Sequence, residues 1–378
     1  MRQNYARKRG AAYGTVKPMA LFWGEASYTK GMNQATKPFT VVFTGGGSGG
    51  HVTPNLALIA HIRKTRPEVD IHYIGTNAIE KKLVTPDKAV FHEISAAKLE
   101  RGKKNIGKIL ALPFALAKSV GEAARILKKI RPDVVFSKGG YVGLPVVIAA
   151  KRQKIRTISH ESDTSLGLAN KIAMRFSDLC LSSFPVKKGG VVVSGSPLNQ
   201  EIYRADKETA LEISGINKNK KVLLVTGGSL GAGVLNMFVF ENFDKLKKNY
   251  AAVLVSGKNK KIALPNGRDF YQTEYTDKLH HFYALADLVL TRAGSNTLCE
   301  LAALGVPFVS VPLSSGSRGE QAGNAGHIAK IAGGEILEEK DLNLENFLEA
   351  AKKADSRAVP EIDGTGVICD YILGACKK

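Results

Sequence analysis

The sequence predicts an α/β protein made of two Rossmann-like, doubly wound domains that face each other across a cleft. Three observations predict this class: short continuous apolar runs typical of buried parallel strands, glycine-rich or polar loops directly after them, and helical stretches between them. A chain of 378 residues with 44% hydrophobic content can fill two cores of ordinary domain size.

Residues 1–37 precede this pattern. They carry basic residues without helical or strand periodicity, and the apolar patch Met19–Trp23 is too short for the core of a signal peptide. We expect a mobile tail or an extension from an upstream start, because Met32 lies just before the first strand.

The first expected domain covers residues 38–197. Its apolar segments alternate between strand and helix, at Phe39–Thr44, Asn55–Arg63, Ile71–Gly75, Val134–Ser137, Val146–Ala150 and Thr157–His160. The run Val191–Ser194 and the turn Gly195-Ser196-Pro197 end this half, so we place the boundary near Pro197.

The second expected domain covers residues 198–360 and repeats the same order. Its predicted strands are Val222–Thr226, Ala252–Ser256, Leu288–Thr291 and Phe308–Val311. In the remaining segment, 361–378, the stretch Val367–Cys376 is suited to a final helix.

Composition excludes several classes of protein. No run reaches the about 18 apolar residues of a membrane-spanning helix, and Pro113 interrupts the longest candidate, Ile109–Ala117. The four cysteines, at positions 180, 299, 369 and 376, form no CxxC pair, which favours reduced thiols in a reducing compartment over a zinc site or a disulfide framework.

The formal charge of +20 indicates an anionic partner, either nucleic acid or a membrane leaflet. Between Lys98 and Arg131, ten basic residues face two acidic ones around an apolar stretch. No aromatic-interleaved basic stripe or nucleic-acid motif is present, so we favour an anionic membrane surface and expect no nucleic acid. The predicted membrane residues are Lys103, Lys104, Lys108, Ile109, Leu110, Leu112, Phe114 and Leu116. The alternative is an amphipathic core helix with a solvated basic face.

The run from Thr44 to His51, Thr-Gly-Gly-Gly-Ser-Gly-Gly-His, lies between a buried strand and a helix. Backbone amides of such a loop, together with a helix N-terminus, favour phosphate or diphosphate. Its glycines also satisfy GxGxxG, so a dinucleotide-dependent oxidoreductase is an alternative. That alternative needs an acid at the end of the second strand, whereas this strand ends in Gly75-Thr76-Asn77 and Asp70 stands at its beginning.

Two further loops carry the same chemistry. Gly227–Gly231 follows the first strand of the second domain and offers another phosphate-type turn. Glu300 lies within the helix after the loop Thr291–Gly294, where a carboxylate suits a ribose diol because it accepts two hydrogen bonds. Alternatively, Glu300 is a solvated helix position.

Six motifs in order resemble one family, the peptidoglycan glycosyltransferases called MurG, which convert lipid I to lipid II. They are Gly45–His51, Ser137–Val142, His160–Asp163 with Leu166–Lys171, Gly227–Gly231, Arg292–Asn296 and Arg318–Asn324, and the resemblance runs from about Phe39 to the C-terminus. It implies a GT-B fold, with UDP-N-acetylglucosamine mainly on the second domain and the undecaprenyl-diphosphate-linked acceptor mainly on the first. It also implies a final helix that returns to the first domain, and a peripheral location at the cytoplasmic face of the membrane.

Matched position by position, the resemblance assigns His51 as the catalytic base, with Asp163 in reserve. Ser229 would meet the donor diphosphate, Thr276 the uracil through its backbone, and Gln321 the sugar. The full donor set is Ser48, Gly49, Gly50, Asp163, Asn199, Ser229, Thr276, Ser295, Asn296, Thr297, Leu298, Cys299, Glu300 and Gln321. The set for the acceptor diphosphate is Gly46, Gly47, Gly139, Gly140 and Tyr141.

Two positions depart from the family pattern. Asn199 stands where arginine is common, and Asp163 where asparagine is common, as in a Gram-positive-like variant. Loss of the arginine removes a charge-assisted contact to the donor. Arg292 and Arg318 are candidates to replace it.

The expected reaction is inverting single displacement at the anomeric carbon of the nucleotide sugar. Asp-x-Asp, the usual acidic clamp for a divalent cation, is absent from the chain. We therefore expect loop amides and helix dipoles to stabilise the leaving diphosphate, without metal or other cofactor. A relative that glycosylates diacylglycerol or another lipid is the alternative within this fold.

Overall fold

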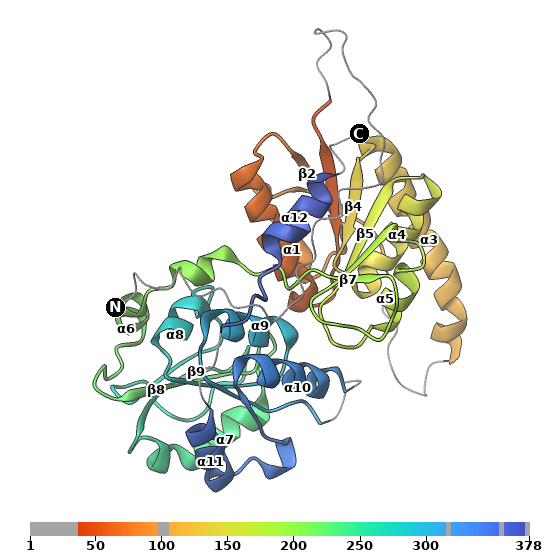
Figure 1. The fold of residues 1–378 in the computed structure, drawn as a ribbon. Coiled ribbons are helices and arrows are strands. Elements are labelled where there is room, and N and C mark those ends of the chain that lie inside the picture. Colours follow the sequence, from red (N-terminus) through yellow and green to blue (C-terminus); the bar gives the residue numbers. More distant parts are fainter. Residues whose placement is uncertain (1–36, 97–105, 315–318, 355–358, 375–378) are drawn as a thin grey trace. The chain divides into compact units, whose positions relative to one another are not determined.

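The structure is a computed structural model that describes residues 37–96, 106–314, 319–354 and 359–374, with the backbone alone at 106–111 (Figure 1). Within this part of the chain, two parallel β-sheets alternate with helices, which confirms the predicted α/β class.

The first sheet has seven strands in the order β3-β2-β1-β4-β5-β6-β7. They are β1 (Thr40–Thr44), β2 (Asp70–Gly75), β3 (Val90–Glu93), β4 (Val134–Ser137), β5 (Arg156–Glu161), β6 (Leu179–Ser182) and β7 (Val191–Val193). The accompanying helices are α1 (Gly49–Thr65), α2 (Ile79–Leu83), α3 (Ile106–Ile130), α4 (Gly140–Arg152) and α5 (Leu168–Ala173).

The second sheet has six strands in the order β10-β9-β8-β11-β12-β13. They are β8 (Lys221–Thr226), β9 (Tyr250–Val255), β10 (Phe270–Thr273), β11 (Leu288–Thr291), β12 (Phe308–Ser310) and β13 (Glu335–Ile336). Its helices are η2 (Gln200–Arg204), α6 (Lys207–Ser214), α7 (Gly233–Leu246), α8 (Leu279–Leu285), α9 (Ser295–Leu304), α10 (Glu320–Ala332), η3 (Glu339–Asp341) and α11 (Leu344–Lys353).

Both sheets reverse their strand order at a central pair, β1 with β4 and β8 with β11. The paired strands end level, because Thr44 lies opposite Ser137 and Thr226 opposite Thr291. In doubly wound sheets, ligands bind outside the carboxyl ends of the strands at this switch point. The loops after β1, β4, β8 and β11 are therefore the ones that the fold brings to binding positions.

Fully buried strands form the cores. In β1, Val41 and Phe43 pack toward α1, and Val42 packs toward α3 and α4. Successive side chains of β1 point to opposite faces of the sheet, and helices cover both faces. Both sets of side chains must therefore be apolar, which explains the unbroken apolar runs in the sequence.

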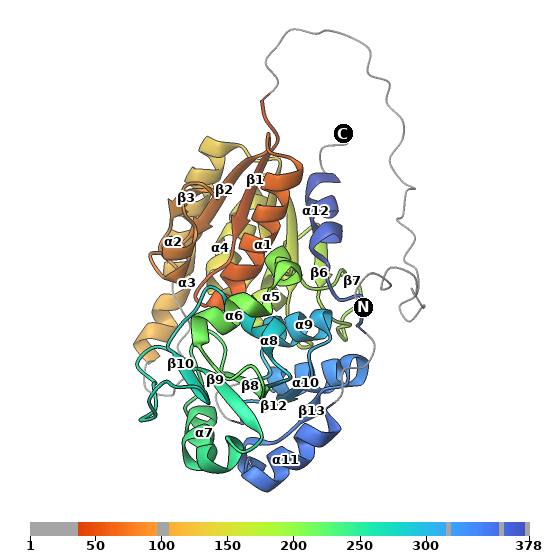
Figure 2. The same cartoon turned by 90° about the vertical axis from the view of Figure 1, so that its left-hand side faces the viewer.

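The last helix, α12 (Thr365–Leu373), lies beside α1 of the first sheet (Figure 2). Its residues Ile368, Cys369 and Ile372 are buried in the same cluster as Val41 and Phe43. The segment expected to return to the first domain thus contributes to that domain's core.

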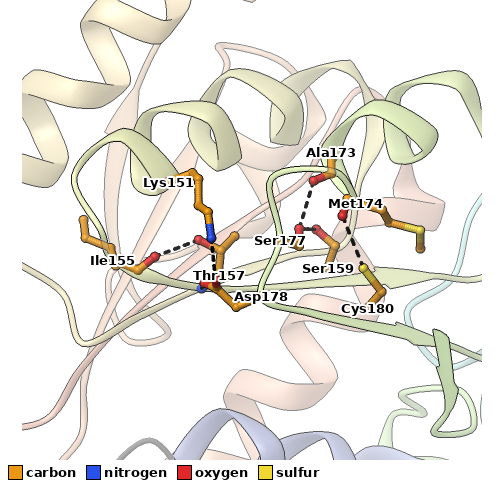
Figure 3. Close-up of polar contacts among 9 residues, drawn as sticks. All are labelled: Lys151, Ile155, Thr157, Ser159, Ala173, Met174, Ser177, Asp178 and Cys180. Atoms are coloured by element: carbon orange, nitrogen blue, oxygen red, sulfur yellow. Dashed lines mark hydrogen bonds and ion pairs between the residues drawn. The ribbon is translucent and has the colours of Figure 1, made fainter. Parts of the chain in front are cut away.

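Polar contacts hold the loop before β6 against β5 (Figure 3). One carboxylate oxygen of Asp178 accepts the Thr157 amide at 2.9 Å, and the other accepts Lys151 Nζ at 2.6 Å. Ser159 and Ser177 share a hydroxyl hydrogen bond of 2.6 Å. These bonds fix the start of β5, the strand that leads into the site.

Some local expectations were wrong. Pro113 does not interrupt its segment, since α3 continues from Ile106 to Ile130; proline in a helix removes a single backbone donor, and packing of the helix on the sheet compensates. The strands β3, β6, β10 and β13 were not predicted. Among the described residues, no helix is long and apolar enough to cross a membrane.

Candidate functional site

The first glycine loop turns sharply between β1 and α1. Gly45 and Gly47 have φ values of 143° and 83°, which side-chain-bearing residues rarely adopt. A Cβ at Gly47 would also collide with the ring of Tyr141. The close packing explains why this loop contains so many glycines.

The loop after β4 packs against the first one. Gly139 and Gly140 have φ values of 91° and 77°, and a Cβ at Gly140 would lie 2.7 Å from the carbonyl oxygen of Gly46. The five residues predicted for the acceptor diphosphate therefore lie together at the first switch point.

His51 occupies the first turn of α1, whose first turn holds no acidic residue. A Cβ at Gly140 would lie 3.1 Å from His51 Cδ2 and 3.4 Å from Nε2, so the bare glycine leaves room along this edge of the imidazole.

Glu80, which the sequence did not indicate, lies fully buried beneath the first loop. Its carboxylate accepts the Thr76 amide at 2.9 Å, the Thr76 hydroxyl, and the Gly47 amide at 3.3 Å. A Cβ at Gly46 or Gly75 would clash with the same side chain. Glu80 therefore fixes the loop from below, a role that no local pattern in the sequence indicates.

A buried polar cluster follows β4 and β5. Lys138 Nζ donates to His160 Nδ1 at 2.6 Å and to the Ser162 hydroxyl at 2.5 Å. His160 Nε2 lies 3.1 Å from the carbonyl oxygen of Gly195, which can only accept, so this nitrogen carries the proton. Burial lowers the pKa of Lys138 to about 8 and holds the pKa of His160 well below its usual value.

Glu161 organises the loop that follows β5. Its Oε1 accepts the amides of Ser162 and Asp163 at 2.8 and 3.2 Å, and its Oε2 accepts the Gly167 amide and the Asn170 side chain at 3.1 and 2.8 Å. These four hydrogen bonds hold the loop that carries Asp163.

The glycine loop after β8 presents Ser229 at its exposed tip. A Cβ at Gly49 would lie 3.4 Å from the Cβ and Oγ of Ser229, so this loop adjoins the N-terminus of α1. At the same place, Asn296 Nδ2 donates to the carbonyl oxygen of Gly50 at 3.3 Å. Phosphate-type loops of the two sheets therefore meet directly.

Asp163 connects the two sheets as well. Its Oδ1 accepts Asn324 Nδ2 of α10 at 3.0 Å, and Asn324 Oδ1 accepts the Thr164 amide at 3.0 Å. Burial and the neighbouring Glu161 raise the pKa of Asp163. The Asp163 carboxylate already accepts a hydrogen bond across the two sheets. This arrangement fits a structural role for Asp163 at least as well as its reserve role as catalytic base.

Glu300 lies in α9, with Oε2 accepting the hydroxyl of Tyr283 at 3.1 Å. Burial raises the pKa of Glu300 to about 7, whereas the hydrogen bond from Tyr283 lowers it. The side chains of Leu298 and Cys299 belong to the apolar core, so only their backbones can face a ligand. Ser295, Asn296 and Thr297 form the first turn of α9, at the second switch point.

The remaining predicted residues are dispersed. Asn199 caps η2 by accepting the Glu201 amide at 3.1 Å, the Thr276 hydroxyl accepts the Lys278 amide at 3.0 Å, and Gln321 Oε1 accepts the Leu313 amide at 3.0 Å. Arg292 pairs with Glu339 at 2.5 Å, which makes it a poor replacement for the missing arginine. Arg318 lies outside the described residues.

The predicted membrane segment is described in part. Lys103 and Lys104 lie outside the described residues, as do the side chains of Lys108, Ile109 and Leu110. Of the rest, Phe114 is 80% exposed, while Leu112 is half-buried and Leu116 packs on the sheet.

Both halves of the chain match known families. The glycosyltransferase family 28 N-terminal domain matches residues 41–181, and the C-terminal domain matches residues 222–359. The UDP-N-acetylglucosamine--N-acetylmuramyl-(pentapeptide) pyrophosphoryl-undecaprenol N-acetylglucosamine transferase of Clostridium perfringens strain SM101 is 41% identical over 84% of this chain and 90% of the relative. The protein of that name from Clostridium tetani is 40% identical over 82% of this chain and 88% of its own length.

A solved structure agrees with these relatives. The crystal structure of Acinetobacter baumannii MurG, 25% identical in sequence, matches with a TM-score of 0.67 over 89% of this chain and 100% of that chain. The structural similarity therefore extends over both sheets. The chain belongs to the MurG family, within glycosyltransferase family 28.

Proposed function

We propose that the protein transfers N-acetylglucosamine from UDP-N-acetylglucosamine to the muramoyl-pentapeptide of undecaprenyl-diphosphate-linked lipid I, and so forms lipid II for peptidoglycan synthesis. The observation that carries this proposal is the meeting of Gly49 with Ser229, which joins a phosphate-type loop from each sheet. One diphosphate would belong to the donor and the other to the acceptor. The names of relatives 41% identical to this chain state the same donor and acceptor.

The donor belongs on the second sheet in this proposal. Ser229 and the first turn of α9 meet the diphosphate, where the helix N-terminus adds partial positive charge. Glu300 accepts the ribose hydroxyls, and the backbone at Thr276 faces the uracil. Gly46, Gly47 and the Gly139–Tyr141 loop take the acceptor diphosphate.

The reaction proceeds in one displacement. The acceptor hydroxyl oxygen forms a bond to the anomeric carbon as the bond from that carbon to the diphosphate oxygen breaks, and configuration inverts. His51 Nε2 takes the hydroxyl proton, and UDP leaves with the bonding electron pair. Amides of the glycine loop and the dipole of α9 stabilise the charge that develops on the diphosphate.

The proposed chemistry needs no metal ion, because the loop amides and helix termini replace a cation at the leaving group. Turnover should therefore be unchanged within about two-fold when EDTA is added to enzyme assayed in metal-free buffer. A loss that added Mg²⁺ or Mn²⁺ restores would overturn metal independence.

We also place the protein at the inner face of the cytoplasmic membrane, where its lipid acceptor would lie. Phe114 projects from α3, and Lys118 one turn later is 70% exposed at its side chain. An exposed aromatic beside basic residues fits insertion at an anionic surface.

The decisive experiment supplies the enzyme with UDP-N-acetylglucosamine and a lipid I analogue, and detects the disaccharide product by mass spectrometry. A parallel reaction offers diacylglycerol in the same detergent. Product from the lipid I analogue alone supports the proposal. Product from diacylglycerol alone, or UDP release without any disaccharide, would assign a different acceptor.

A further inference from the structure

Tyr283 of α8 has a ring packed in the core and a hydroxyl that forms a hydrogen bond. Its side chain is 1% exposed and belongs to the core cluster beneath the second sheet. The hydroxyl is directed at Glu300 Oε2, at 3.1 Å. A buried tyrosine normally finds a polar partner for its hydroxyl, and here that partner is a carboxylate at the binding edge of the sheet.

The hydrogen bond constrains Glu300 in two ways. It occupies one lone pair of Oε2 and so limits rotation of the carboxylate, which leaves Oε1 and the other lone pairs for a ligand. It also stabilises the ionised form of Glu300. Burial acts in the opposite direction and raises the pKa of Glu300 to about 7.

Some of the ionisable groups on α9 and on the elements packed against α9 and α8 are neutral or have a partner other than Glu300. Burial raises the pKa of the adjacent Cys299 thiol to about 12, so the thiol is neutral. Glu201 and Arg204 of η2 pair with each other at 3.0 Å, and the ring of His327 of α10 packs at a tilt against Phe184, with 5.1 Å between the ring centroids. The remaining groups are Glu320 and Lys330 of α10, His280 and His281 of α8, and Lys207, Glu208 and Glu212 of α6.

We propose that Tyr283 is a positioning residue for the nucleotide ribose: its hydroxyl holds the Glu300 carboxylate in the orientation that accepts the 2′- and 3′-hydroxyls. This inference rests on the ribose role of Glu300 proposed above. A carboxylate held in this way distinguishes a ribonucleotide from its 2′-deoxy analogue, because the analogue leaves a buried acceptor unpaired. Tyr283 thereby contributes to sugar selectivity without touching the donor.

The test substitutes Tyr283→Phe, which keeps the packed ring and removes only the hydroxyl. The dissociation constants of UDP and 2′-deoxy-UDP are measured by calorimetry from pH 6 to pH 9. We expect the UDP constant to rise about 3- to 10-fold at pH 7.5, as for loss of one hydrogen bond to a charged group. The constant for 2′-deoxy-UDP should rise less, so that discrimination between the two nucleotides shrinks.

The pH dependence gives a second readout. Glu300 accepts both ribose hydroxyls only when ionised, so UDP affinity in the parent rises with pH through about 7. Without the hydrogen bond from Tyr283, the carboxyl keeps its proton to higher pH. The midpoint of the affinity profile should therefore move to higher pH in Tyr283→Phe.

Two further variants separate the possible outcomes. Tyr271→Phe makes the same change beside the same core, where Tyr271 stacks on Phe282, and should leave both constants and the midpoint unchanged. If Glu300→Gln leaves nucleotide affinity and discrimination as in the parent, the ribose assignment and this inference fall together. Glu300→Gln can instead reduce nucleotide affinity and the discrimination between UDP and 2′-deoxy-UDP. If Tyr283→Phe then keeps the parent's discrimination and the midpoint of its pH profile, only the role of Tyr283 is overturned. Partial unfolding of Tyr283→Phe would weaken the binding of UDP and of 2′-deoxy-UDP by the same factor. The ratio of the two constants would then stay as in the parent, and this outcome also overturns the role of Tyr283.

Discussion

At the scale of single residues, the region around His51 shows how an absent side chain can matter as much as a present one. A Cβ at Gly140 would lie 3.1 Å from His51 Cδ2, and a Cβ at Gly49 would lie 3.4 Å from Ser229. Any Cβ at Gly140 would approach both the imidazole and the carbonyl oxygen of Gly46. The glycines therefore let the loops approach each other closely at the N-terminus of α1.

His51→Ala tests the proposed base. Turnover should fall about 10²- to 10⁴-fold, the usual contribution of general base catalysis, while the UDP dissociation constant stays within about two-fold. Steady-state kinetics with a soluble lipid I analogue, together with calorimetry, measures both. Turnover within a few-fold of the parent would move the role to another group, and normal turnover with weaker acceptor binding would make His51 a binding residue.

Ser229→Ala tests the donor diphosphate site. If the Ser229 hydroxyl donates to a charged phosphate oxygen as proposed, its removal should weaken UDP binding by about 1–3 kcal/mol. The exposed Ser229 has no core contact to lose, so thermal stability should not change. Calorimetry with UDP measures the effect, and unchanged affinity in a folded variant would remove Ser229 from the donor site.

At the scale of elements, the sequence was most informative where the strands are completely buried. β1, β4 and β11 are buried at every position, and continuous apolar runs predicted all three. β3 is different, because its residues Val-Phe-His-Glu are half-buried or exposed at the sheet edge. Edge strands lack a two-sided apolar environment, so their pattern does not stand out from a loop.

The positions of the loops at the candidate site were predictable because each loop is contiguous in sequence. The glycine loops each occupy a few consecutive residues beside a predicted strand, and the fold then brings them together. Glu80 and Tyr283 have no such signal, because the contacts that connect them to the site, with Gly47 and Glu300, are made with residues distant in sequence. Tertiary packing alone defines those roles.

The exposed face of α3 gives a prediction at this scale. Phe114→Ser should reduce binding to vesicles that contain anionic phospholipid, because the ring is 80% exposed and burying it in the interface contributes about 1.5–3 kcal/mol. Turnover of a soluble acceptor should not change. Co-sedimentation with vesicles measures the binding.

A matched control for Phe114 lies on another helix. Met237→Ser changes an apolar side chain that is 47% exposed on α7 and should leave vesicle binding as in the parent. An equal loss of vesicle binding in the two variants would mean that any exposed apolar side chain replaced by serine has this effect. No loss in Phe114→Ser would favour the alternative interpretation of α3 as an ordinary core helix with a solvated face.

At the scale of the whole molecule, the chain passes between the two sheets twice, and the two passages touch. The Ser196 amide donates to Ile362 at 2.8 Å, and the Gly364 amide donates to Ser196 at 2.9 Å. Gly195, with φ of 80°, has no room for a Cβ because Ile362 lies 2.7 Å from that position. Leu198 and Thr365 exchange two further hydrogen bonds of 2.9 and 3.1 Å. The outgoing and returning segments are therefore held as a pair.

The returning segment makes the stability of the first sheet depend on residues near the end of the chain. Ile368 of α12 is 0% exposed in the cluster that also holds Phe43 of β1, so Ile368→Ala leaves a cavity there and should reduce the free energy of unfolding by about 2–5 kcal/mol. Val367→Ala, one residue earlier on the exposed side of the helix at 50% exposure, should cost no more than about 0.5 kcal/mol. Urea unfolding followed by circular dichroism gives both values, and hydrogen exchange should show faster opening of α1 in Ile368→Ala, because α12 packs on that helix. Equal, small effects of the two substitutions would mean that α12 lies on the first sheet without stabilising it.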